Sequence, residues 1–235
     1  LKDFIKQNCI GQGSYGKVYK VKELKSQEVY AAKVLIDTLN FTSNDQIIDI
    51  SRELNIMSQL NHPSVLKLEG FSPFDFKKKL RPVIITEYAS NGTLEDLISK
   101  QRNIISGSIF DDTHKLIIIY GIASAMAYLH SHNIIHRDLK PSNILLDNHL
   151  FPKIGDFGLS KINHSNLDSM TLESVNNTIK GTPIYMSPEI WEKYEYSKSS
   201  DVYAFSMICY EIMTKEKPFE KTFIFSIPVK LKNDY

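Results

Sequence analysis

The sequence predicts a two-lobed α+β protein, with an antiparallel, strand-rich first lobe and a mostly helical second lobe. Alternating apolar segments before Tyr88 predict strands, whereas apolar residues at helical spacing after Thr93 predict helices. Between them, Ala89-Ser90-Asn91-Gly92 interrupts both patterns. We therefore expect a first lobe at residues 1–89 and a second lobe at residues 90–235.

The composition is that of an ordinary globular protein and excludes several function classes. The chain has 235 residues, 42% of them hydrophobic and 23% charged. A net charge of +1 predicts neither nucleic acid nor an anionic membrane as partner. Cys9 and Cys209 lie far apart, which gives no disulfide or zinc framework and favours a cytoplasmic location. The apolar runs are too short or too interrupted to cross a bilayer.

A glycine-rich stretch lies between two segments that predict a β-hairpin. Gly11, Gly13 and Gly16 would let backbone N–H groups approach phosphate oxygens closely. The pattern alone is equally typical of a turn with no ligand. A dinucleotide-binding fold requires a helix directly afterwards, but Val18 and Val21 continue as strand, which disfavours that fold.

Lys33 interrupts the apolar strand predicted at Val29–Leu35, and the alanines before it leave room for a flat ligand. Ser43-Asn44-Asp45-Gln46 has the spacing of a helix capping box. Glu53 lies at the edge of the apolar stripe of that helix, where an unpaired carboxylate is costly, so we expect it to pair with Lys33. A carboxylate solvated beside Arg52 is the alternative.

Two further strands are predicted at Val65–Leu68 and Val83–Tyr88. A basic stretch, Lys77-Lys78-Lys79 with Arg81, connects them. Because a run of charge is most often a solvated loop, we assign this stretch no partner.

The second lobe is predicted to contain two long helices. Asp112-Thr113 would cap the first, which ends near His132 and has an apolar face of Leu116, Tyr120, Ala123 and Leu129. Asp201 would cap the second, Val202–Met213, which is apolar nearly all round and is therefore expected to lie deep in the core. Ile144–Leu146 and Pro152–Ile154 predict a small hairpin. His114, His130 and His132 lack a convincing metal-ligand spacing.

The stretch from His136 to Asn143 combines an acid, a cation and an amide. Pro141 forbids a regular helix, so a shaped loop is expected. Asp138 could accept a proton from a hydroxyl, Lys140 could neutralise a phosphoryl group, and Asn143 could ligate a hard cation. Asp156, between two glycines, has the chemistry to hold Mg²⁺. Taken alone, the stretch is better explained as a short polar loop that caps helices, and the alternative for Asp156 is a simple turn.

Together, these motifs resemble the eukaryotic protein kinase family in their order and spacing. The resemblance implies that Gly11, Gly13 and Gly16 cover the phosphates of ATP, and that Lys33, paired with Glu53, holds the α- and β-phosphates. It further implies contacts to the adenine and its surroundings from a set of residues in both lobes: Val18, Ala31, Thr86, Glu87, Ala89 and Leu145.

The same resemblance assigns the chemical step to the second lobe. Asp138 would be the catalytic base and Lys140 the contact to the γ-phosphate, with Asn143 and Asp156 as Mg²⁺ ligands. Lys140 and the pair Gly181-Thr182 look like the serine/threonine-specific pattern, so a protein bearing Ser or Thr is the implied substrate. The stretch 201–206 is similar to the tyrosine-kinase-like group.

The chain departs from the family pattern in three ways. Ser187 and Ser206 stand where Ala and Gly are usual, which are small changes. The family continues past the second long helix with further helices and an Arg that pairs with the position of Glu189, yet no Arg follows Arg137. The stretch Phe223–Val229 is typical of an exposed strand rather than of covering helices. We therefore expect an incomplete or aberrantly terminated domain.

Three functions remain open at this stage. An active kinase is favoured, a nucleotide-binding pseudoenzyme or interaction module is the alternative, and a dinucleotide-dependent oxidoreductase is opposed by the strand after the glycines. Arg137 resembles the arginine of kinases switched by phosphorylation of the loop 160–180. The candidate acceptors in that loop are Ser165, Ser169, Thr171, Ser174 and Thr178.

Overall fold

The computed structural model describes residues 1–13, 16–35, 44–102, 110–162, 181–220, 222 and 226–227, with the backbone alone for 44–49. The chain forms two compact units, Leu1–Asn61 with Leu66–Ser90, and His62–Val65 with Asn91–Tyr235. The four residues His62–Val65 lie with the second unit, although the sequence analysis assigns them to the first lobe. Ile154 N donates to Ser64 O at 2.8 Å and accounts for that placement.

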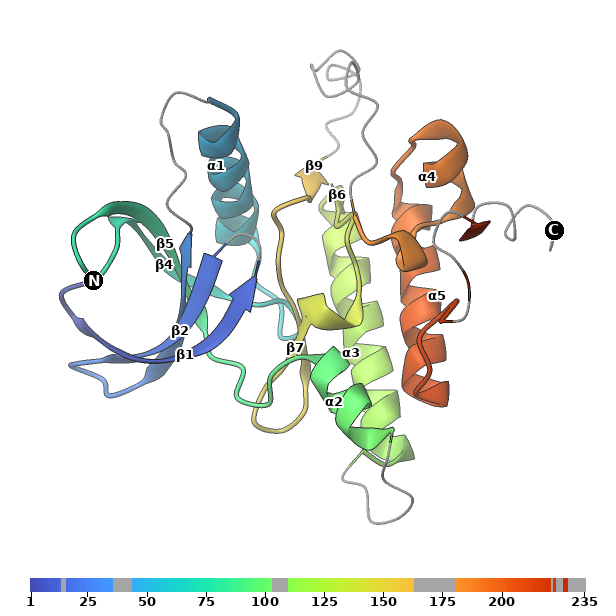
Figure 1. Ribbon diagram of the computed structural model, residues 1–235, viewed down its shortest axis with the longest axis horizontal. Helices are drawn as coiled ribbons and strands as arrows, with labels where there is room; N and C mark the ends of the chain where they lie inside the picture. Colours follow the sequence, from blue (N-terminus) through green and yellow to red (C-terminus); the bar gives the residue numbers. More distant parts are fainter. Residues whose placement is uncertain are drawn as a thin grey trace. The chain divides into compact units, whose positions relative to one another are not determined.

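The first unit is a five-stranded antiparallel sheet with the strand order β1-β2-β3-β5-β4 and one helix (Figure 1). Its strands are β1 (Phe4–Gly13), β2 (Gly16–Glu23), β3 (Val29–Leu35), β4 (Leu68–Phe74) and β5 (Leu80–Glu87), and its helix is α1 (Asn44–Gln59).

Strand alternation places the core of this unit on one face of the sheet. Ala32 is paired with Ile85 and Val34 with Val83, and these side chains meet Val21 on the same face. The predicted strand Val29–Leu35 is confirmed, whereas the strand predicted at Val65–Leu68 is wrong, since β4 begins at Leu68. Val65 instead forms an isolated parallel bridge with Ile154 of the second unit.

In α1, the buried face contains Glu53, Ile56 and Met57, and Leu60 directly after the helix is also buried. The predicted capping box at 43–46 cannot be assessed, because Ser43 and the side chains of 44–49 lie outside the described part of the chain. The described part of α1 nevertheless carries the carboxylate of Glu53 into a buried position, 8% exposed.

The second unit is built around α3 (Asp112–Ser131), which runs alongside α5 (Lys198–Thr214) (Figure 1). Its other helices are α2 (Leu94–Gln101) and α4 (Pro188–Lys193), with 3₁₀ turns η1 (Pro141–Asn143) and η3 (Pro183–Tyr185). Short strands pair antiparallel: β6 (Ile134–Ile135) with β9 (Lys161–Ile162), and β7 (Ile144–Leu146) with β8 (Pro152–Ile154). The last pair confirms the predicted hairpin.

The helix caps of this unit correct two predictions. Thr93 caps α2 in a reciprocal capping box with Asp96, as expected for a helix that starts there. Asp111, rather than Asp112-Thr113, caps α3 by accepting a hydrogen bond from His114 N. Ser197, rather than Asp201, caps α5. Asp201 therefore lies inside the first turn of α5, where its carboxylate is available for long-range contacts.

The buried faces of the two long helices also differ from the prediction. In α3, Leu116 and Tyr120 are 66% and 76% exposed, and the buried residues are Ile118, Gly121, Ile122, Ala125, Met126 and Leu129. In α5, Val202 and Met213 are more than half exposed, while Ala204, Ile208 and Ile212 are buried. Both sequences are apolar nearly all round, so periodicity could not select the packed face.

Of the stretch Phe223–Val229, the structure describes Ser226 and Ile227, and Ile227 is fully buried rather than exposed. Within the described residues, no helix is both long and apolar enough to cross a membrane.

Candidate functional site

One face of the first unit's sheet collects four of the predicted site residues. Val18 is paired with Lys33 across β2 and β3, and Ala31 is paired with Thr86 across β3 and β5. Ala31 and Lys33 are two residues apart on β3 and so point to the same side. The four side chains therefore share the face opposite the Ala32 and Ile85 core.

The three glycines fall into two classes when a Cβ atom is placed on each. A Cβ at Gly16 would clash with the carbonyl oxygen of Val34, so this glycine is required by the close approach of β2 and β3. A Cβ at Gly13 would meet nothing within 4 Å, and one at Gly11 would make ordinary contact with Val18. Packing among the described residues therefore explains Gly16 but leaves open space beside Gly13, as a ligand-covering backbone would require.

Lys33 and Glu53 are brought together as the sequence analysis expects. Lys33 Nζ lies 3.5 Å from Glu53 Oε1, and the two side chains are 25% and 10% exposed. At the end of β5, Glu87 Oε1 accepts a hydrogen bond from Lys67 N at 2.8 Å, and Thr86 Oγ1 donates to Glu87 O. Glu87 is thus fixed to the segment before β4.

In the second unit, three donors converge on the carboxylate of Asp138. Lys140 Nζ lies 2.7 Å from Oδ2, Asn143 Nδ2 donates to Oδ2 at 3.1 Å, and Thr182 Oγ1 donates to Oδ1 at 2.9 Å. Lys140 Nζ also donates to Thr182 Oγ1 at 2.7 Å. Since an ionised carboxylate offers about four acceptor positions, the three contacts from the described residues leave Asp138 capacity for one further donor.

Asn143 and Asp156 are held close in the fold by their backbones. Gly155 N donates to Asn143 O at 2.9 Å, and the Asn143 amide nitrogen is occupied by Asp138, which leaves its amide oxygen as a neutral ligand. Asp156 adopts a left-handed conformation with φ 60°. A carboxylate and an amide oxygen fit Mg²⁺, which commonly takes one or two carboxylates plus substrate phosphates. The described residues contain no group of three or more His, Cys, Asp or Glu side chains suited to a metal ion.

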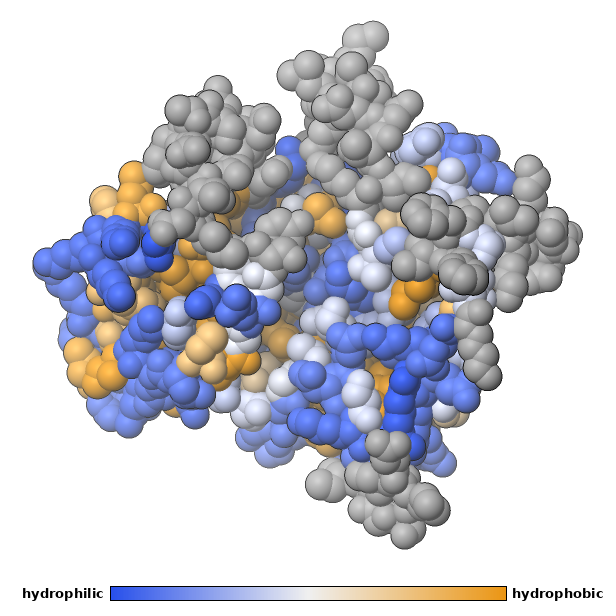
Figure 2. Space-filling model, viewed as in Figure 1, coloured by the Kyte–Doolittle hydropathy of each residue, from blue (hydrophilic) through white to orange (hydrophobic). Residues whose placement is uncertain are grey.

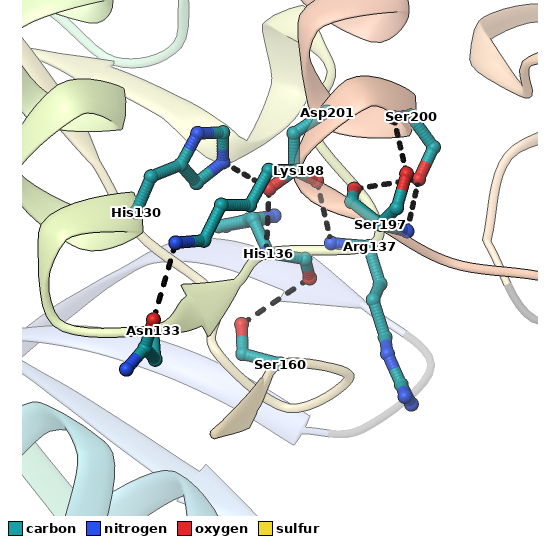
Figure 3. Close-up of polar contacts among 9 residues, drawn as sticks. All are labelled: His130, Asn133, His136, Arg137, Ser160, Ser197, Lys198, Ser200 and Asp201. Carbon is teal, nitrogen blue, oxygen red and sulfur yellow. Dashed lines mark hydrogen bonds and ion pairs between the residues drawn. The ribbon is translucent and has the colours of Figure 1, made fainter. Parts of the chain in front are cut away.

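Asp201 anchors the backbone that carries Asp138 (Figure 3). Its Oδ2 accepts from His136 N at 2.9 Å and its Oδ1 accepts from Arg137 N at 3.0 Å. His130 Nε2 lies 2.9 Å from Oδ2, so a histidine from α3 contacts the same oxygen as His136 N. These bonds hold Arg137 at φ 69°, in the left-handed region that is unfavourable for a side-chain-bearing residue.

Two buried residues tie the Asp138 loop to the segment that follows Asp156. His136 is 1% exposed, its Nε2 lies 3.1 Å from Gly155 O, and its ring packs edge-on against Phe157 with a centroid separation of 5.4 Å. Ser160 Oγ donates to His136 O at 3.2 Å (Figure 3). These contacts connect the loop that carries Asp138 to the segment that follows Asp156.

A buried pair that the sequence analysis did not single out lies behind the Thr182 turn. Tyr185 Oη donates to Glu211 Oε2 at 2.7 Å, and Glu211 is 1% exposed. Burial raises the pKa of the Glu211 carboxyl above its ordinary value, against the opposing effects of Tyr185 and Lys217. Burial, followed by the contact with Glu211, raises the pKa of the Tyr185 hydroxyl.

The remaining predicted site residues are placed as follows. Leu145 lies in β7 of the second unit and forms an isolated bridge with Thr93, and Ala89 follows β5 in the first unit. Ser14, Tyr15 and the phosphoacceptor candidates Ser165, Ser169, Thr171, Ser174 and Thr178 lie outside the described residues. Sequence reasoning missed His130 as a contact of Asp201, because the two lie 71 residues apart with no local pattern linking them.

Comparison with known proteins gives a consistent family assignment. The sequence matches the protein kinase domain over residues 4–227. It is 32% identical to a putative serine/threonine-protein kinase A of Trypanosoma brucei brucei over 216 residues, which cover 92% of this chain and 48% of that protein. It is 34% identical to a human putative 3-phosphoinositide-dependent protein kinase 2 over 237 residues, which cover 100% of this chain and 56% of that protein.

A third relative, the calmodulin-binding receptor-like cytoplasmic kinase 2 of Arabidopsis thaliana, is 32% identical over 222 residues, covering 93% of this chain and 51% of that protein. The chain thus spans about half the length of these curated relatives. Since the match extends over nearly all of the sequence, this chain belongs to the protein kinase domain family.

Proposed function

We propose that this chain transfers the γ-phosphoryl group of Mg-ATP to serine or threonine hydroxyls of protein substrates. The observation that carries the proposal is the environment of the Asp138 carboxylate, which is contacted by Lys140, Asn143 and Thr182 and keeps one acceptor position open. A carboxylate held in this way is suited to receive and orient a substrate hydroxyl.

In the proposed reaction, Asp138 accepts the hydroxyl proton as the substrate oxygen forms a bond to the γ-phosphorus. The bond from that phosphorus to the β,γ-bridging oxygen breaks, and ADP leaves with the electron pair. Lys140, held within 2.7 Å of both Asp138 and Thr182, offers positive charge where the transferring phosphoryl group gains negative charge. Asn143 and Asp156 would hold the Mg²⁺, which neutralises the phosphate charge when it is bound with ATP. Phosphoryl transfer depends mainly on such positioning and charge neutralisation.

The nucleotide contacts of the proposal lie on the face that Val18, Ala31, Lys33 and Thr86 share in the first unit. Glu53 supports the position of Lys33, and small side chains at Gly13 and Ala31 leave room for a phosphate and a flat base. Leu145, Glu87 and Ala89 are proposed to complete the adenine contacts by resemblance alone. The assignment to the tyrosine-kinase-like group stays a prediction.

We do not favour the pseudoenzyme alternative. The residues that the family uses for chemistry, Lys33, Glu53, Asp138, Asn143 and Asp156, are all present. The named relatives include serine/threonine-protein kinases as well. No property of the described structure favours the oxidoreductase reading, because β2 follows the glycines directly and no helix intervenes.

The test compares the wild-type chain with Asp138→Asn in transfer of radiolabelled phosphate to a generic Ser/Thr substrate and in binding of Mg-ATP. The substitution should lower the transfer rate at least about 100-fold while ATP binding is retained, because general-base contributions are of that size. Asp112→Asn is the matched control, since the Asp112 side chain is 89% exposed on α3.

Wild-type protein that binds Mg-ATP but transfers no phosphate would replace this proposal with the pseudoenzyme. Wild-type protein that binds no ATP would rule out both the kinase and the nucleotide-binding pseudoenzyme. Equal loss in Asp138→Asn and Asp112→Asn would show that the measured activity does not depend on the Asp138 site.

A further inference from the structure

The β4–β5 hairpin of the first unit ends in a tightly organised basic turn. Asp75 Oδ1 accepts from Lys77 N at 2.8 Å and from Lys79 N at 2.9 Å, and Asp75 N donates to Lys79 O at 2.9 Å. Lys78 takes the left-handed conformation with φ 59° that closes the turn. The three lysine side chains are therefore presented on a backbone that is fixed by its own hydrogen bonds.

The exposed charge of this turn is positive. Lys77, Lys78 and Lys79 are all exposed, whereas Asp75, the acidic residue of the turn, is 7% exposed. Asp75 Oδ2 also lies 3.8 Å from Arg81 Nη1, so its negative charge is directed inward and offset. A fourth exposed lysine, Lys6, lies close by, with its Nζ 5.8 Å from the centroid of the Phe76 ring.

Exposed apolar side chains flank the same turn. Phe74 and Leu80 are directly paired across β4 and β5 at the last position before the turn, and they are 50% and 48% exposed. Directly opposed residues of an antiparallel pair lie on the same face. Figure 2 shows hydrophobic residues among hydrophilic ones on the surface of the sheet-bearing part of the molecule.

From these contacts we propose that the end of the β4–β5 hairpin is a peripheral membrane-binding tip for anionic phospholipid. Lys77, Lys78 and Lys79 contact headgroup phosphates, and the Phe74 and Leu80 pair enters the interface beside them. Surface binding of this kind combines buried apolar area with attraction of basic side chains to anionic lipid. It concerns the surface of the bilayer and requires no spanning helix.

The shape of this region favours a lipid surface over an acidic peptide. The apolar pair and the lysines lie at the end of a hairpin whose strand β4 is at the edge of the sheet, so they project from the end of the sheet. The turn is ordered before binding, so docking costs little conformational entropy. The net charge of +1 is too small to drive such binding, which makes the local arrangement the deciding feature.

The first test measures co-sedimentation of the full chain with vesicles of phosphatidylcholine, alone or with about one third phosphatidylserine. We expect binding to the anionic vesicles only. Replacing Lys77, Lys78 and Lys79 with Gln should weaken it about 100-fold, since each lysine near an anionic surface contributes about 1 kcal/mol. Lys25→Gln, Lys100→Gln and Lys193→Gln together make the matched control, because these exposed lysines lie elsewhere and the net charge changes equally.

The second test isolates the apolar pair. Phe74→Ser with Leu80→Ser should weaken binding to the anionic vesicles about tenfold, as expected for loss of two half-buried apolar contacts. Leu116→Ser with Tyr120→Ser removes two exposed apolar side chains from α3 and should leave binding unchanged. Circular dichroism verifies that each variant is folded, which is expected because all four side chains are substantially exposed.

Three results would overturn the proposal. Equal binding to neutral and anionic vesicles, or none to either, removes the lipid assignment. Equal weakening by the two lysine triples shows a nonspecific charge effect. Binding of a biotinylated poly-glutamate peptide through the same lysines, without vesicle binding, assigns the tip to an acidic protein instead. Each result is independent of phosphoryl transfer, so failure here leaves the proposed catalytic function untouched.

Discussion

Each of the two units places a lysine beside a carboxylate, but the two pairs are held differently. Lys33 and Glu53 come from β3 and α1 and are 3.5 Å apart, whereas Lys140 and Asp138 lie two residues apart on one loop at 2.7 Å. Both pairs are buried to a similar degree. The contact between Lys33 and Glu53 therefore depends on how α1 packs on the sheet. The contact between Lys140 and Asp138 depends on the local backbone, which Asp201 fixes.

Asp201→Ala should therefore have the largest combined effect on activity and stability. The change leaves the buried N–H groups of His136 and Arg137 without their acceptor, which should lower the free energy of unfolding by about 3–5 kcal/mol. Phosphoryl transfer should be lost with it, since these bonds set the loop that carries Asp138. Urea unfolding followed by fluorescence measures the first effect, and Asp112→Ala serves as the control. A variant that stays both stable and active would mean that the loop keeps its fold without this anchor.

Lys33→Met should distinguish the two pairs, because it should affect activity more than stability. Methionine keeps the length of the lysine, but Glu53, whose side chain is 10% exposed, loses this contact, so the free energy of unfolding should fall by about 1–3 kcal/mol. Transfer should fall at least about 100-fold because the proposed donor to the ATP phosphates is lost. Initial rates and thermal unfolding on the same samples provide the measurement. A loss of stability as large as that of Asp201→Ala would contradict the contrast between the two pairs.

Sequence reasoning succeeded where the signal was local. The strand Val29–Leu35, the hairpin of β7 and β8 and the start of α2 at Thr93 follow from alternation, turn residues and a capping box that a short window contains. The Lys33 and Glu53 pairing was also predictable, because a carboxylate at the edge of an apolar stripe needs a partner.

The sequence was insufficient where contacts are long-range or the pattern is uniform. The central part of α3 is apolar on every side, so the exposure of Leu116 and Tyr120 depends on which elements pack against it. Asp201 looked like a cap because acidic residues favour helix starts, but its carboxylate accepts from backbone groups 64 and 65 residues away. Only the folded chain brings those groups together.

His130 offers a finer test of how Asp201 holds the loop, because its Nε2 contacts the same Asp201 oxygen as His136 N. His130→Leu removes that contact while keeping an apolar side chain of similar size, and should lower kcat about tenfold, the scale of a hydrogen bond to a charged group. His130→Gln places an amide nitrogen near the position of Nε2 and should restore kcat to within about threefold of wild type. The KM for ATP should be unchanged in both, measured by steady-state kinetics.

The matched control for this pair is His132→Leu, since His132 is exposed at the end of the same helix and contacts the Tyr128 carbonyl oxygen. If the Leu and Gln variants of His130 lose kcat equally, the contact with Asp201 does not position the loop and His130 serves packing alone.

Glu211 offers a contrast with Glu53, because its buried partner is the neutral Tyr185 rather than a lysine. Burial raises the pKa of Glu211 above 4.5, so its contribution to stability is full below pH 4.5 and is lost as the pH rises through the folded-state pKa. Glu211→Gln does not titrate. The melting temperature of wild type relative to Glu211→Gln should therefore fall as the pH increases above 4.5. If the melting temperature of wild type relative to Glu211→Gln instead rises with pH, Lys217 stabilises the ionised form of Glu211.

Ser187→Ala should have the smallest effect on the free energy of unfolding, and it should raise that free energy rather than lower it. Ser187 is fully buried, and its Oγ has no hydrogen-bond partner among the described residues, although it precedes α4 at the N-cap position. A buried hydroxyl without a partner costs free energy, so its removal should raise the free energy of unfolding by about 1 kcal/mol. Activity should be unchanged, because the side chain forms no hydrogen bond with Asp138 or Lys140 among the described residues.

Urea unfolding of Ser187→Ala is compared with that of Ser131→Ala, in which the replaced hydroxyl is exposed and donates to Tyr128 O. The comparison separates the removal of an unpartnered group from serine replacement in general. A lower stability of Ser187→Ala would indicate that the Ser187 hydroxyl forms a hydrogen bond in solution. The surroundings of the start of α4 in the second unit would then be polar.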